Sequence, residues 1–389
     1  MTEKVEIKLK QNSNYYQVNL LRIGSILILF LMFIDYFQDT RIFMVISAVL
    51  GLFLFLFALV KRYFNRTHLM LFFILCFGVS INSAITMQNP FVIGYIITSF
   101  TIGATIKKGD IGPYLSRLVF LTSIMYLSYL LFYVGKDPNE IFAHSSRNHI
   151  STVLLSYTIM IYLSDWLYGR EIPVLWPACA LLIFSVISVG RTGIVVSILL
   201  FIVVFSQRIY LQFKKKPVYI FGIIFISFIL LLVMNNQIEI LEYLRKLYYG
   251  YRFGGAWDDL RYDLWREFFT ELNIHRAIFG LDLTELPLIG YYSGNPHNSF
   301  IHFWSRTGII SFILFATIGW SAFKLLQKSL FLTMLLGIFL LRAFYDITIL
   351  FSHLDFVLFA LLFVAIENKQ YLYNNIQQRE LKNKLISNT

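Results

Sequence analysis

The sequence predicts an all-α protein, a polytopic membrane bundle of about twelve helices with one large, partly helical loop outside the membrane. Hydrophobic residues make up 58% of the chain and charged residues only 14%, and the mean hydropathy of +0.67 is far above that of soluble domains. Apolar runs recur from Leu20 to Ile366, and each is long enough to cross a hydrocarbon layer of about 30 Å. Because the runs are continuous and do not alternate, they exclude a porin-like barrel.

Polar interruptions divide the chain into its expected segments. The expected spans are 20–37, 42–60, 69–87, 91–106, 115–134, 150–167, 174–189, 194–206, 217–234, 297–320, 329–345 and 349–366. The segments are therefore an amino-terminal start (1–19), a first block of spans (20–234), a large loop (235–296), a second block of spans (297–366) and a basic tail (367–389). No small-residue cleavage site follows the first run, so we expect a retained helix and not a removed signal peptide.

The positions of lysine and arginine predict the orientation in the membrane. If the amino terminus is cytoplasmic, nearly every basic cluster of a short loop lies inside, including Lys107/Lys108 and 214–216. The outer short loops then hold only Arg41, Lys136, Arg147 and Arg191. The positive-inside rule thus predicts that both termini are cytoplasmic and that the loop 235–296 lies outside. The net charge of +11 reflects this orientation, and nucleic acid is not an expected partner.

The long loop is expected to be folded. Between Ile238 and Tyr249, apolar residues recur at helical spacing, as in a helix that lies along a membrane surface. Arg261–Leu272 predicts a second amphipathic helix, with Leu264, Trp265 and Phe268 on one side. We expect this loop to carry the chemistry, because the other connections are short.

Arg191 is a candidate binding residue. It stands in Ser188-Val189-Gly190-Arg191-Thr192-Gly193, between two apolar runs, where the glycines allow backbone or a ligand to come close. A charge at the end of a span is costly unless it faces a wet cavity or a partner. The alternative is an arginine that reaches lipid phosphate from the loop.

His297 is the candidate base. The segment Asn295-Pro296-His297-Asn298-Ser299 opens a long span, where Pro296 suits the first helical position and Asn295 or Ser293 suits the cap. A helix amino terminus favours anions and keeps an imidazole neutral, which suits a base beside a phosphate. Asn298 offers a further polar contact. The alternative is that His297 only anchors the chain at the membrane interface.

Two arginines of the loop are candidate anion ligands. Arg261 lies four residues before Trp265 on one helix face, and a guanidinium held near the membrane surface binds a diphosphate with two parallel hydrogen bonds. Arg266 is a second candidate. Each alternatively pairs with a neighbouring acid, and these acids are Asp258, Asp259, Asp263 and Glu267.

A polar cluster precedes the span 150–167. His144-Ser145-Ser146-Arg147-Asn148-His149 offers Arg147, Asn148 and His149 as contacts to sugar hydroxyls or a phosphate, or is only a solvated loop. Arg306 is expected about 13 Å inside its span. A buried arginine there needs a partner, and the candidates are Asp346, Asp355 and Asp35. Four further histidines show no accompanying pattern and are expected to be structural: His68, His275, His302 and His353.

No metal or other cofactor is expected. The run Asp258-Asp259-x-x-x-Asp263 does not have the spacing of the usual prenyl-diphosphate motif, so these acids are interpreted as solvated or paired with arginine. Cys76 and Cys179 lie in separate apolar runs, which favours packing roles over a disulfide or a metal site.

These residues carry a resemblance to a known family. The chain resembles the O-antigen polymerase/ligase superfamily, which contains Wzy-type polymerases and WaaL-type ligases and has about twelve helices with a large periplasmic loop near the carboxy end. Three stretches carry the likeness: Gly190-Arg191-Thr192-Gly193, Arg261 to Trp265 followed by Phe279-Gly280, and Pro296-His297-Asn298-Ser299 with Gly308 eleven positions after the histidine.

The resemblance implies a GT-C-like, metal-independent glycosyltransferase of the bacterial inner membrane. Arg191 and Arg261 would bind the diphosphate of an undecaprenyl-linked donor, and His297 would act near the acceptor hydroxyl. The expected function is a polysaccharide polymerase, which transfers a growing glycan to the terminal sugar of a lipid-linked repeat unit. The expected partners are undecaprenyl-diphosphate-linked oligosaccharides, membrane lipid and a chain-length regulator or other assembly protein.

Two alternatives stay open. A ligase would transfer the glycan to lipid A core, and donor handling would look the same in its sequence. A flippase for the same lipid-linked sugars would have repeated halves, charges along a central path and no large folded loop. Here the polar residues gather on one side of the membrane, which favours an enzyme.

Overall fold

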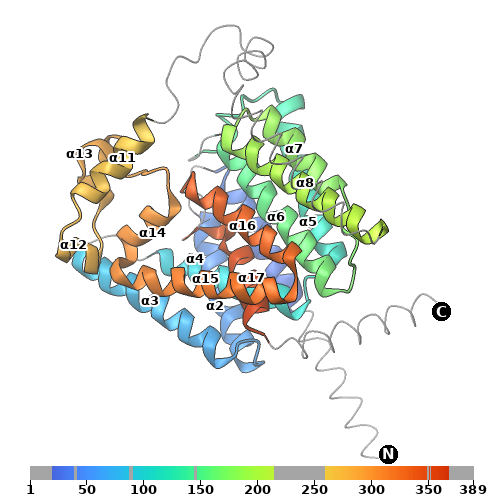
Figure 1. The fold of residues 1–389 in the computed structure, drawn as a ribbon, viewed down its shortest axis with the longest axis horizontal. Helices are drawn as coiled ribbons and strands as arrows, with labels where there is room; N and C mark the ends of the chain where they lie inside the picture. The colour runs from blue at the N-terminus through green and yellow to red at the C-terminus, as the bar shows by residue number, and fades with distance from the viewer. Residues whose placement is uncertain are drawn as a thin grey trace, which may run out of the picture.

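The computed structural model describes residues 20–38, 42–86, 91–143, 147–213, 259–347, 350 and 352–367. Within these ranges the regular structure is entirely helical, which confirms the expected fold class for this part of the chain (Figure 1). Several predictions lie outside the described residues: the start 1–19, the span 217–234, the loop helix Ile238–Tyr249, Asp258 and nearly all of the tail.

Most of the observed helices lie within a few residues of the expected spans, but the helix Arg191–Phe213 ends seven residues later and the helix Phe356–Ile366 begins seven residues later than expected. The first covers residues 20–35, and the next are α2 (Ile42–Val60), α3 (Arg66–Thr86), α4 (Val92–Lys108), α5 (Pro113–Ser128, continued by a π-helical turn over Tyr129–Tyr133), α6 (Asn148–Leu167), α7 (Trp176–Ile187) and α8 (Arg191–Phe213). The carboxy-terminal part contains α11 (Asp259–Thr270), α12 (Ile274–Phe279), α13 (Pro287–Tyr291), α14 (Ser299–Thr307), α15 (Ser311–Lys328), α16 (Leu330–Phe344) and α17 (Phe356–Ile366).

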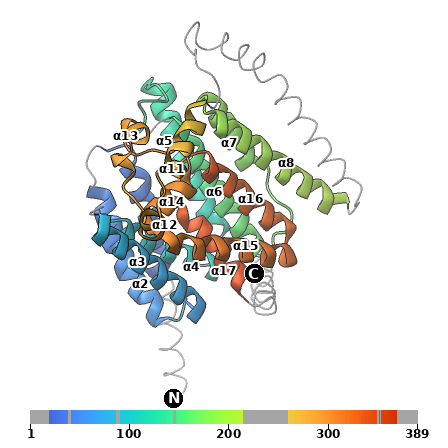
Figure 2. The same cartoon turned by 60° about the vertical axis from the view of Figure 1, so that its left-hand side comes forward.

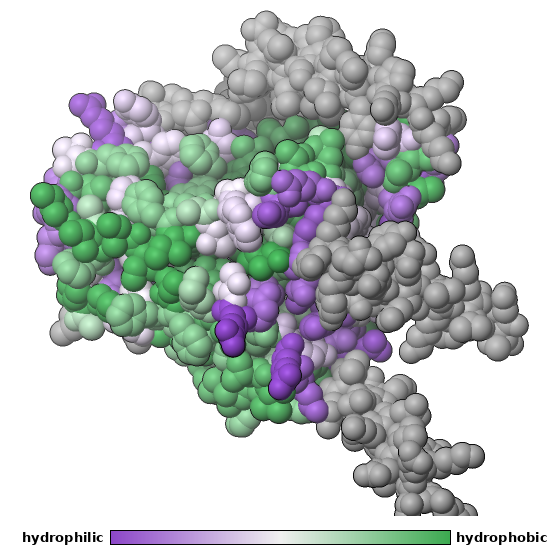
Figure 3. Space-filling model, turned by 60° about the horizontal axis from the view of Figure 1, so that its bottom comes forward, coloured by the Kyte–Doolittle hydropathy of each residue, from purple (hydrophilic) through white to green (hydrophobic). Residues whose placement is uncertain are grey.

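The molecule is a helical membrane protein by the length and composition of its helices. Six described segments are long and apolar enough to cross a membrane, namely α2, α3, α5 with its π-helical turn, α6, α8 and the pair α14–α15. Large apolar side chains cover their outward faces, and Phe53 is 66% exposed. Figure 3 shows this apolar surface on one face of the molecule. Hydrocarbon is the solvent that such a surface suits.

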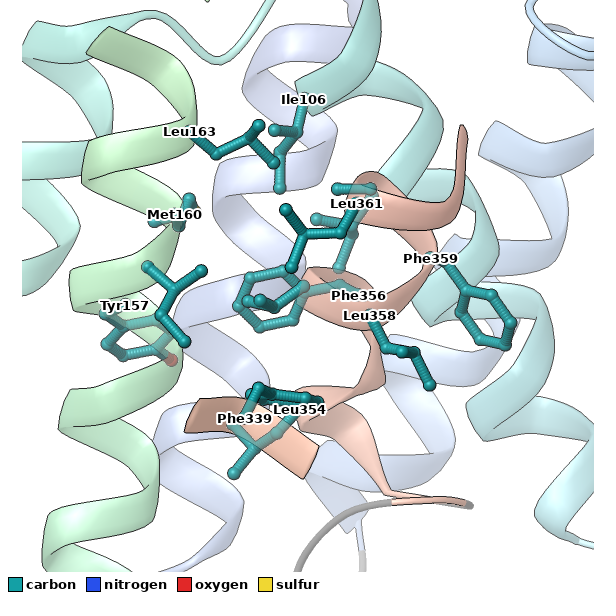
Figure 4. Close-up of a cluster of buried hydrophobic side chains, with 14 of the residues drawn as sticks. Ile106, Tyr157, Met160, Leu163, Phe339, Leu354, Phe356, Leu358, Phe359 and Leu361 are labelled. Atoms are coloured by element: carbon teal, nitrogen blue, oxygen red, sulfur yellow. The ribbon is translucent and has the colours of Figure 1, made fainter. Parts of the chain in front are cut away.

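The core lies around α6, which is buried along nearly its whole length and lies near the centre of the bundle (Figure 2). Met160 and Leu163 of α6 pack near Ile106 of α4 and Leu361 of α17 (Figure 4). Gly103 allows α4 and α17 to approach closely, because a Cβ there would lie 2.9 Å from the backbone nitrogen of Ala360.

One group of helix ends meets through basic side chains. These ends are the ones expected on the cytoplasmic side. The contacts that join them are Arg22 with the Asp110 carbonyl, Lys107 with Glu367, Arg117 with Asp165, and Lys328 with the carbonyls of Val364 and Ala365. The lysine and arginine pattern from which the orientation is predicted thus corresponds to a set of ends that lie together.

The opposite helix ends also meet one another. Their contacts are Asp35 with the Met44 N–H and with His353, the Tyr36 carbonyl with Ala143, the Asn148 carbonyl with Arg342, the Asp346 carbonyl with Ser299, and the Phe279 carbonyl with Asn82. The predicted alternation of spans puts all of these residues on one side of the membrane. We call this group of ends the loop side, because α11, α12 and α13 lie there.

The described part of the long loop is folded, as predicted. Leu264 and Phe268 of α11 are buried against Leu283, Leu286 and Ile289, which form a second, smaller core. The Glu267 carboxylate accepts hydrogen bonds of 2.8 Å from the backbone N–H groups of Leu288 and Ile289, at the start of α13. Both views of the fold show α11–α13 together against the bundle (Figures 1 and 2).

The expected span 297–320 is wrong as a single helix. Pro296 is not at the first helical position: α14 begins at Ser299, and the Asn298 side chain caps it by accepting hydrogen bonds from the Phe300 and Ile301 N–H groups. The predicted caps, Asn295 and Ser293, lie farther upstream. His297 therefore precedes the helix, with a left-handed backbone at φ 50°.

A second break separates α14 from α15. α14 ends at Thr307, a 3₁₀ turn covers Gly308–Ile310, and α15 begins at Ser311. Gly308 has φ 56°, and a Cβ there would lie 1.9 Å from the Ile278 carbonyl oxygen. Only glycine fits this close approach between the turn and α12. The break leaves α14 as a short helix on the loop side.

Candidate functional site

The centre of the candidate site is a buried ion pair on the loop side. Arg342, in the last turn of α16, is fully buried, and its Nη2 donates to Asp346 Oδ2 at 2.9 Å. Its Nε donates to Thr152 Oγ1 at 2.8 Å, and Nη2 also donates to the Asn148 carbonyl at 3.0 Å. The pair thereby connects α16 to the first turn of α6.

Asp346 is held as a carboxylate. Burial acts against its charge, but the Arg342 guanidinium and then His149 outweigh burial, so the pKa of Asp346 lies below its usual value. Its backbone carbonyl accepts from the Ser299 hydroxyl at the start of α14. Arg342 keeps one buried atom, Nη1, without a hydrogen-bond partner among the described residues. A buried guanidinium N–H without a partner is costly, and a bound anion would satisfy it.

His297 lies beside this pair. Its backbone N–H donates to Asn295 Oδ1 at 2.8 Å, and the preceding Pro296 carbonyl accepts from Trp265 Nε1 at 3.0 Å. Burial lowers the pKa of His297, and Asp346 opposes that shift only in part. The imidazole is therefore neutral at neutral pH. Its Nδ1 is buried, and no described residue forms a hydrogen bond with it, so this nitrogen is suited to a substrate hydroxyl.

Arg261 reaches the same place from α11. Its guanidinium lies 5.8 Å from the centre of the Tyr345 ring, and its charge acts on both His297 and Arg342. The Arg261 side chain thus approaches the ion pair from the folded loop. Arg266 is exposed, and no contact brings it to this group. Of the two loop arginines predicted to bind an anion, Arg261 alone shares the site.

The turn that contains Arg191 lies against the start of α6. A Cβ on Gly190 would lie 2.9 Å from Asn148 Oδ1, and a Cβ on Gly193 would lie 2.6 Å from Ser151 Cβ. Both glycines are thus required by close packing, as the sequence suggested. Arg191, which begins α8, is half-buried and lies one residue from this contact. The turn is therefore next to the Arg342–Asp346 pair through Asn148.

The residues of the predicted polar cluster before α6 differ in how they contact the candidate site. Asn148 accepts from Arg342 through its carbonyl, and Arg147 precedes it at the helix start. The His149 ring lies 4.8 Å from the Tyr36 ring, centre to centre, and interacts electrostatically with Asp346. By contrast, Asn298 uses its side-chain oxygen as the cap of α14, which leaves only its NH₂ group for a ligand.

Sequence reasoning missed two residues of this group. Arg342 was not singled out, although an arginine inside an apolar run with an aspartate four residues later is a recognisable signal. His353 was expected to be only structural. Its Nε2 lies 3.8 Å from Asp35 Oδ2, and its ring lies 6.1 Å from that of Tyr36, so it extends the polar group toward the first helix.

The partner expected for Arg306 was also wrong. Arg306 lies in the last turn of α14, and its Nε donates to His302 Nε2 at 3.2 Å. Asp346, Asp355 and Asp35 were the predicted partners. Instead, Asp346 pairs with Arg342, and Asp355 caps the 3₁₀ turn before α17. Asp35 contacts the Met44 N–H and His353. The break at Gly308 explains the error, since it places Arg306 at a helix end and not within a long span.

The described residues contain no group of three or more His, Cys, Asp or Glu side chains that could hold a metal ion. Comparison of the chain with protein-family models and with curated proteins gives no match.

Proposed function

We propose that this protein is a bacterial inner-membrane polysaccharide polymerase, a metal-independent glycosyltransferase of the O-antigen type. It transfers a growing glycan from undecaprenyl diphosphate to the terminal sugar hydroxyl of a lipid-linked repeat unit. One observation carries the proposal: Arg261, the Arg342–Asp346 pair, His297 and the Arg191 turn, which are far apart in sequence, meet at the loop side.

The proposed reaction is a displacement at the anomeric carbon of the donor. The acceptor hydroxyl oxygen forms a bond to that carbon, and the bond from the carbon to the diphosphate oxygen breaks. Undecaprenyl diphosphate leaves with the electron pair. The hydroxyl proton passes to His297, whose buried Nδ1 has no other partner among the described residues. A neutral imidazole of lowered pKa is a suitable base for this step.

The arginines supply the stabilisation that the leaving group needs. A departing diphosphate gains negative charge, and guanidinium groups already in position stabilise that charge without reorganisation. Arg261 acts from the loop and Arg191 from the start of α8. Arg342 is held by Asp346, Thr152 and Asn148, and its Nη1 is an additional donor beside them.

The proposed location follows from the charge pattern. Basic residues at the opposite helix ends indicate the cytoplasmic side, so both termini are cytoplasmic and the site faces the periplasm. A chain-length regulator or another assembly protein is a further proposed partner. The substrates are amphipathic, so the lipid chains of donor and acceptor both lie in the membrane and their diphosphates lie at this face.

Two other functions would use similar parts. An O-antigen ligase would carry out the same displacement with lipid A core as acceptor. A flippase for lipid-linked sugars is the third candidate, and a folded loop packed against a polar group on one side argues against it. Of the three, the polymerase is preferred.

The glycans of a deletion strain distinguish the three functions. Loss of a polymerase leaves single repeat units attached to core, loss of a ligase leaves no attached glycan, and loss of a flippase causes lipid-linked units to accumulate in the cytoplasm. The first pattern is expected. With purified protein, glycan extension should also persist in excess chelator. If the chelator abolished extension and magnesium restored it, the proposed metal-independent mechanism would be wrong.

A further inference from the structure

A second cationic group lies on α14, apart from the Arg342–Asp346 pair. Arg306 and His302 share a face of this helix, and Arg306 Nε donates to His302 Nε2 at 3.2 Å. Because His302 Nε2 accepts this bond, the neutral imidazole carries its hydrogen on Nδ1. That Nδ1 is buried and has no hydrogen-bond partner among the described residues. The group therefore presents donors that no described residue uses.

Arg306 differs from Arg342 and Arg117 in how its charge is balanced. Arg342 pairs with Asp346, and Arg117 pairs with Asp165. In the described ranges no carboxylate forms an ion pair with Arg306, and no hydrogen bond to these residues uses its Nη1 or Nη2. Asp282 acts on it only at longer range. Arg306 is half-buried, and its Nη atoms are not among the buried side-chain atoms that lack a partner, so an anion from outside the described residues can reach them.

The position of Arg306 suits a lipid phosphate. The neighbouring Ser305 carbonyl accepts from Asn82 Nδ2 at 3.2 Å, and Asn82 lies four residues, or about 6 Å, before the end of α3. Ser299, which bonds Asp346, lies seven residues before Arg306, or about 10 Å along α14. The two cationic centres thus lie at opposite ends of one short helix, both near the loop-side ends of the spans.

Aromatic and imidazole rings connect the two centres. Tyr95 of α4 interacts electrostatically with Arg306, and its ring lies 4.3 Å from that of His353. Next come Tyr36, 6.1 Å from His353, and His149, 4.8 Å from Tyr36. These rings form a continuous row from Arg306 to the group around Asp346.

We infer that Arg306 and His302 bind the phosphate of a second lipid-linked substrate, so that donor and acceptor diphosphates are held at opposite ends of α14. This inference rests on the proposed function and makes it more specific. In a polymerase, both the donor and the acceptor are linked to a lipid through a diphosphate. Two cationic centres on one face match two such substrates, and a sugar chain between them would bring the acceptor hydroxyl toward His297.

The binding stoichiometry of undecaprenyl diphosphate without sugar tests the inference. Native mass spectrometry of the purified full-length protein should show two bound molecules. Arg306→Gln should retain one and bind the second roughly 10- to 100-fold more weakly, as expected when charge-assisted hydrogen bonds are removed. His302→Ala should weaken the same molecule to a smaller extent. Arg276→Gln is the matched control, because Arg276 pairs with Glu271 on the loop surface and should leave both molecules bound.

Three outcomes would overturn the inference. Binding of a single molecule by the wild type, or of two by Arg306→Gln with unchanged affinities, would show that Arg306 has only a structural role. Displacement of the second molecule by excess phosphatidylglycerol would identify the site as a bulk-lipid contact. Retention of the first molecule by Arg306→Gln shows that the variant is folded. Since the assay requires no transfer, a protein that binds two molecules but does not extend glycans would refute the proposed function alone.

Discussion

Substitution of Arg342 or Asp346 is expected to reduce the stability of the protein most. A buried charge left without its partner destabilises a protein by about 3–5 kcal/mol, whereas replacing both charges with apolar residues is often neutral. We therefore expect Arg342→Met alone, or Asp346→Leu alone, to lower the free energy of unfolding by this amount. The double variant should recover most of the loss but remain inactive. Reversible unfolding in mixed micelles measures this, and a double variant less stable than both singles contradicts the pairing.

His297 gives the site its expected pH dependence. Burial lowers the pKa of His297, and the neutral imidazole is the form that accepts a proton. Activity should therefore be full above the pKa and fall as the pH drops through it, with the acid limb of kcat/KM below the usual histidine value of about 6.5. A pH–rate profile on purified protein tests this. An acid limb centred above pH 7 would assign the titration to a different group.

Among single residues, the sequence indicated the candidate site residues better than it indicated the residues that hold them in place. Arg191, Arg261 and His297 were predicted because each stands in a polar motif between apolar runs, and each lies in or beside the site. Arg342 was missed even though Asp346 lies four residues later, and the other residues that bind it come from α6, almost two hundred positions earlier. Such distant pairing has no local signature in one sequence.

At the scale of elements, the turn at Gly308 sets the direction of α14. The left-handed φ and the close Ile278 carbonyl leave no room for a side chain. We expect Gly308→Ala to displace α14 and to lower both thermal stability and glycan extension. Gly319→Ala is the matched control, because no atom lies within 4 Å of a Cβ there and alanine favours a helix. Equal behaviour of the two variants would show that the break is dispensable.

The element boundaries were predictable to within a few residues where hydropathy sets them. α2 begins and ends where expected, and α3, α4 and α6 differ by only a few positions. The break between α14 and α15 was not predicted, although Arg306-Thr307-Gly308 interrupts the apolar run there, because an isolated glycine in a helical pattern is often tolerated. The left-handed turn at His297 was not predicted either, because proline is common both in turns and at the first position of a helix.

At the scale of the whole molecule, the two groups of helix ends predict the topology. Reporter fusions after Arg170, among the basic ends, and after Asn273, in the folded loop, should report opposite sides of the membrane. The physical reason is that lysine and arginine are retained on the cytoplasmic side. Fusions that report the same side would mean that the predicted alternation is wrong. The alternation itself was predictable because hydrophobic length limits each span, but the packing of the spans around α6 was not.

The extension of a purified, undecaprenyl-diphosphate-linked repeat unit by the purified protein is the direct test of the proposed polymerase activity. We predict that the wild type forms longer glycans and that His297→Ala binds the donor normally but loses turnover. Arg191→Lys should fail almost as badly as Arg191→Ala, about 10²–10³-fold, because an ammonium cannot reproduce the paired hydrogen bonds of a guanidinium. Near-normal extension by folded His297→Ala or Arg191→Ala protein would rule out the proposed mechanism, as would a wild type that binds the substrate and never extends it.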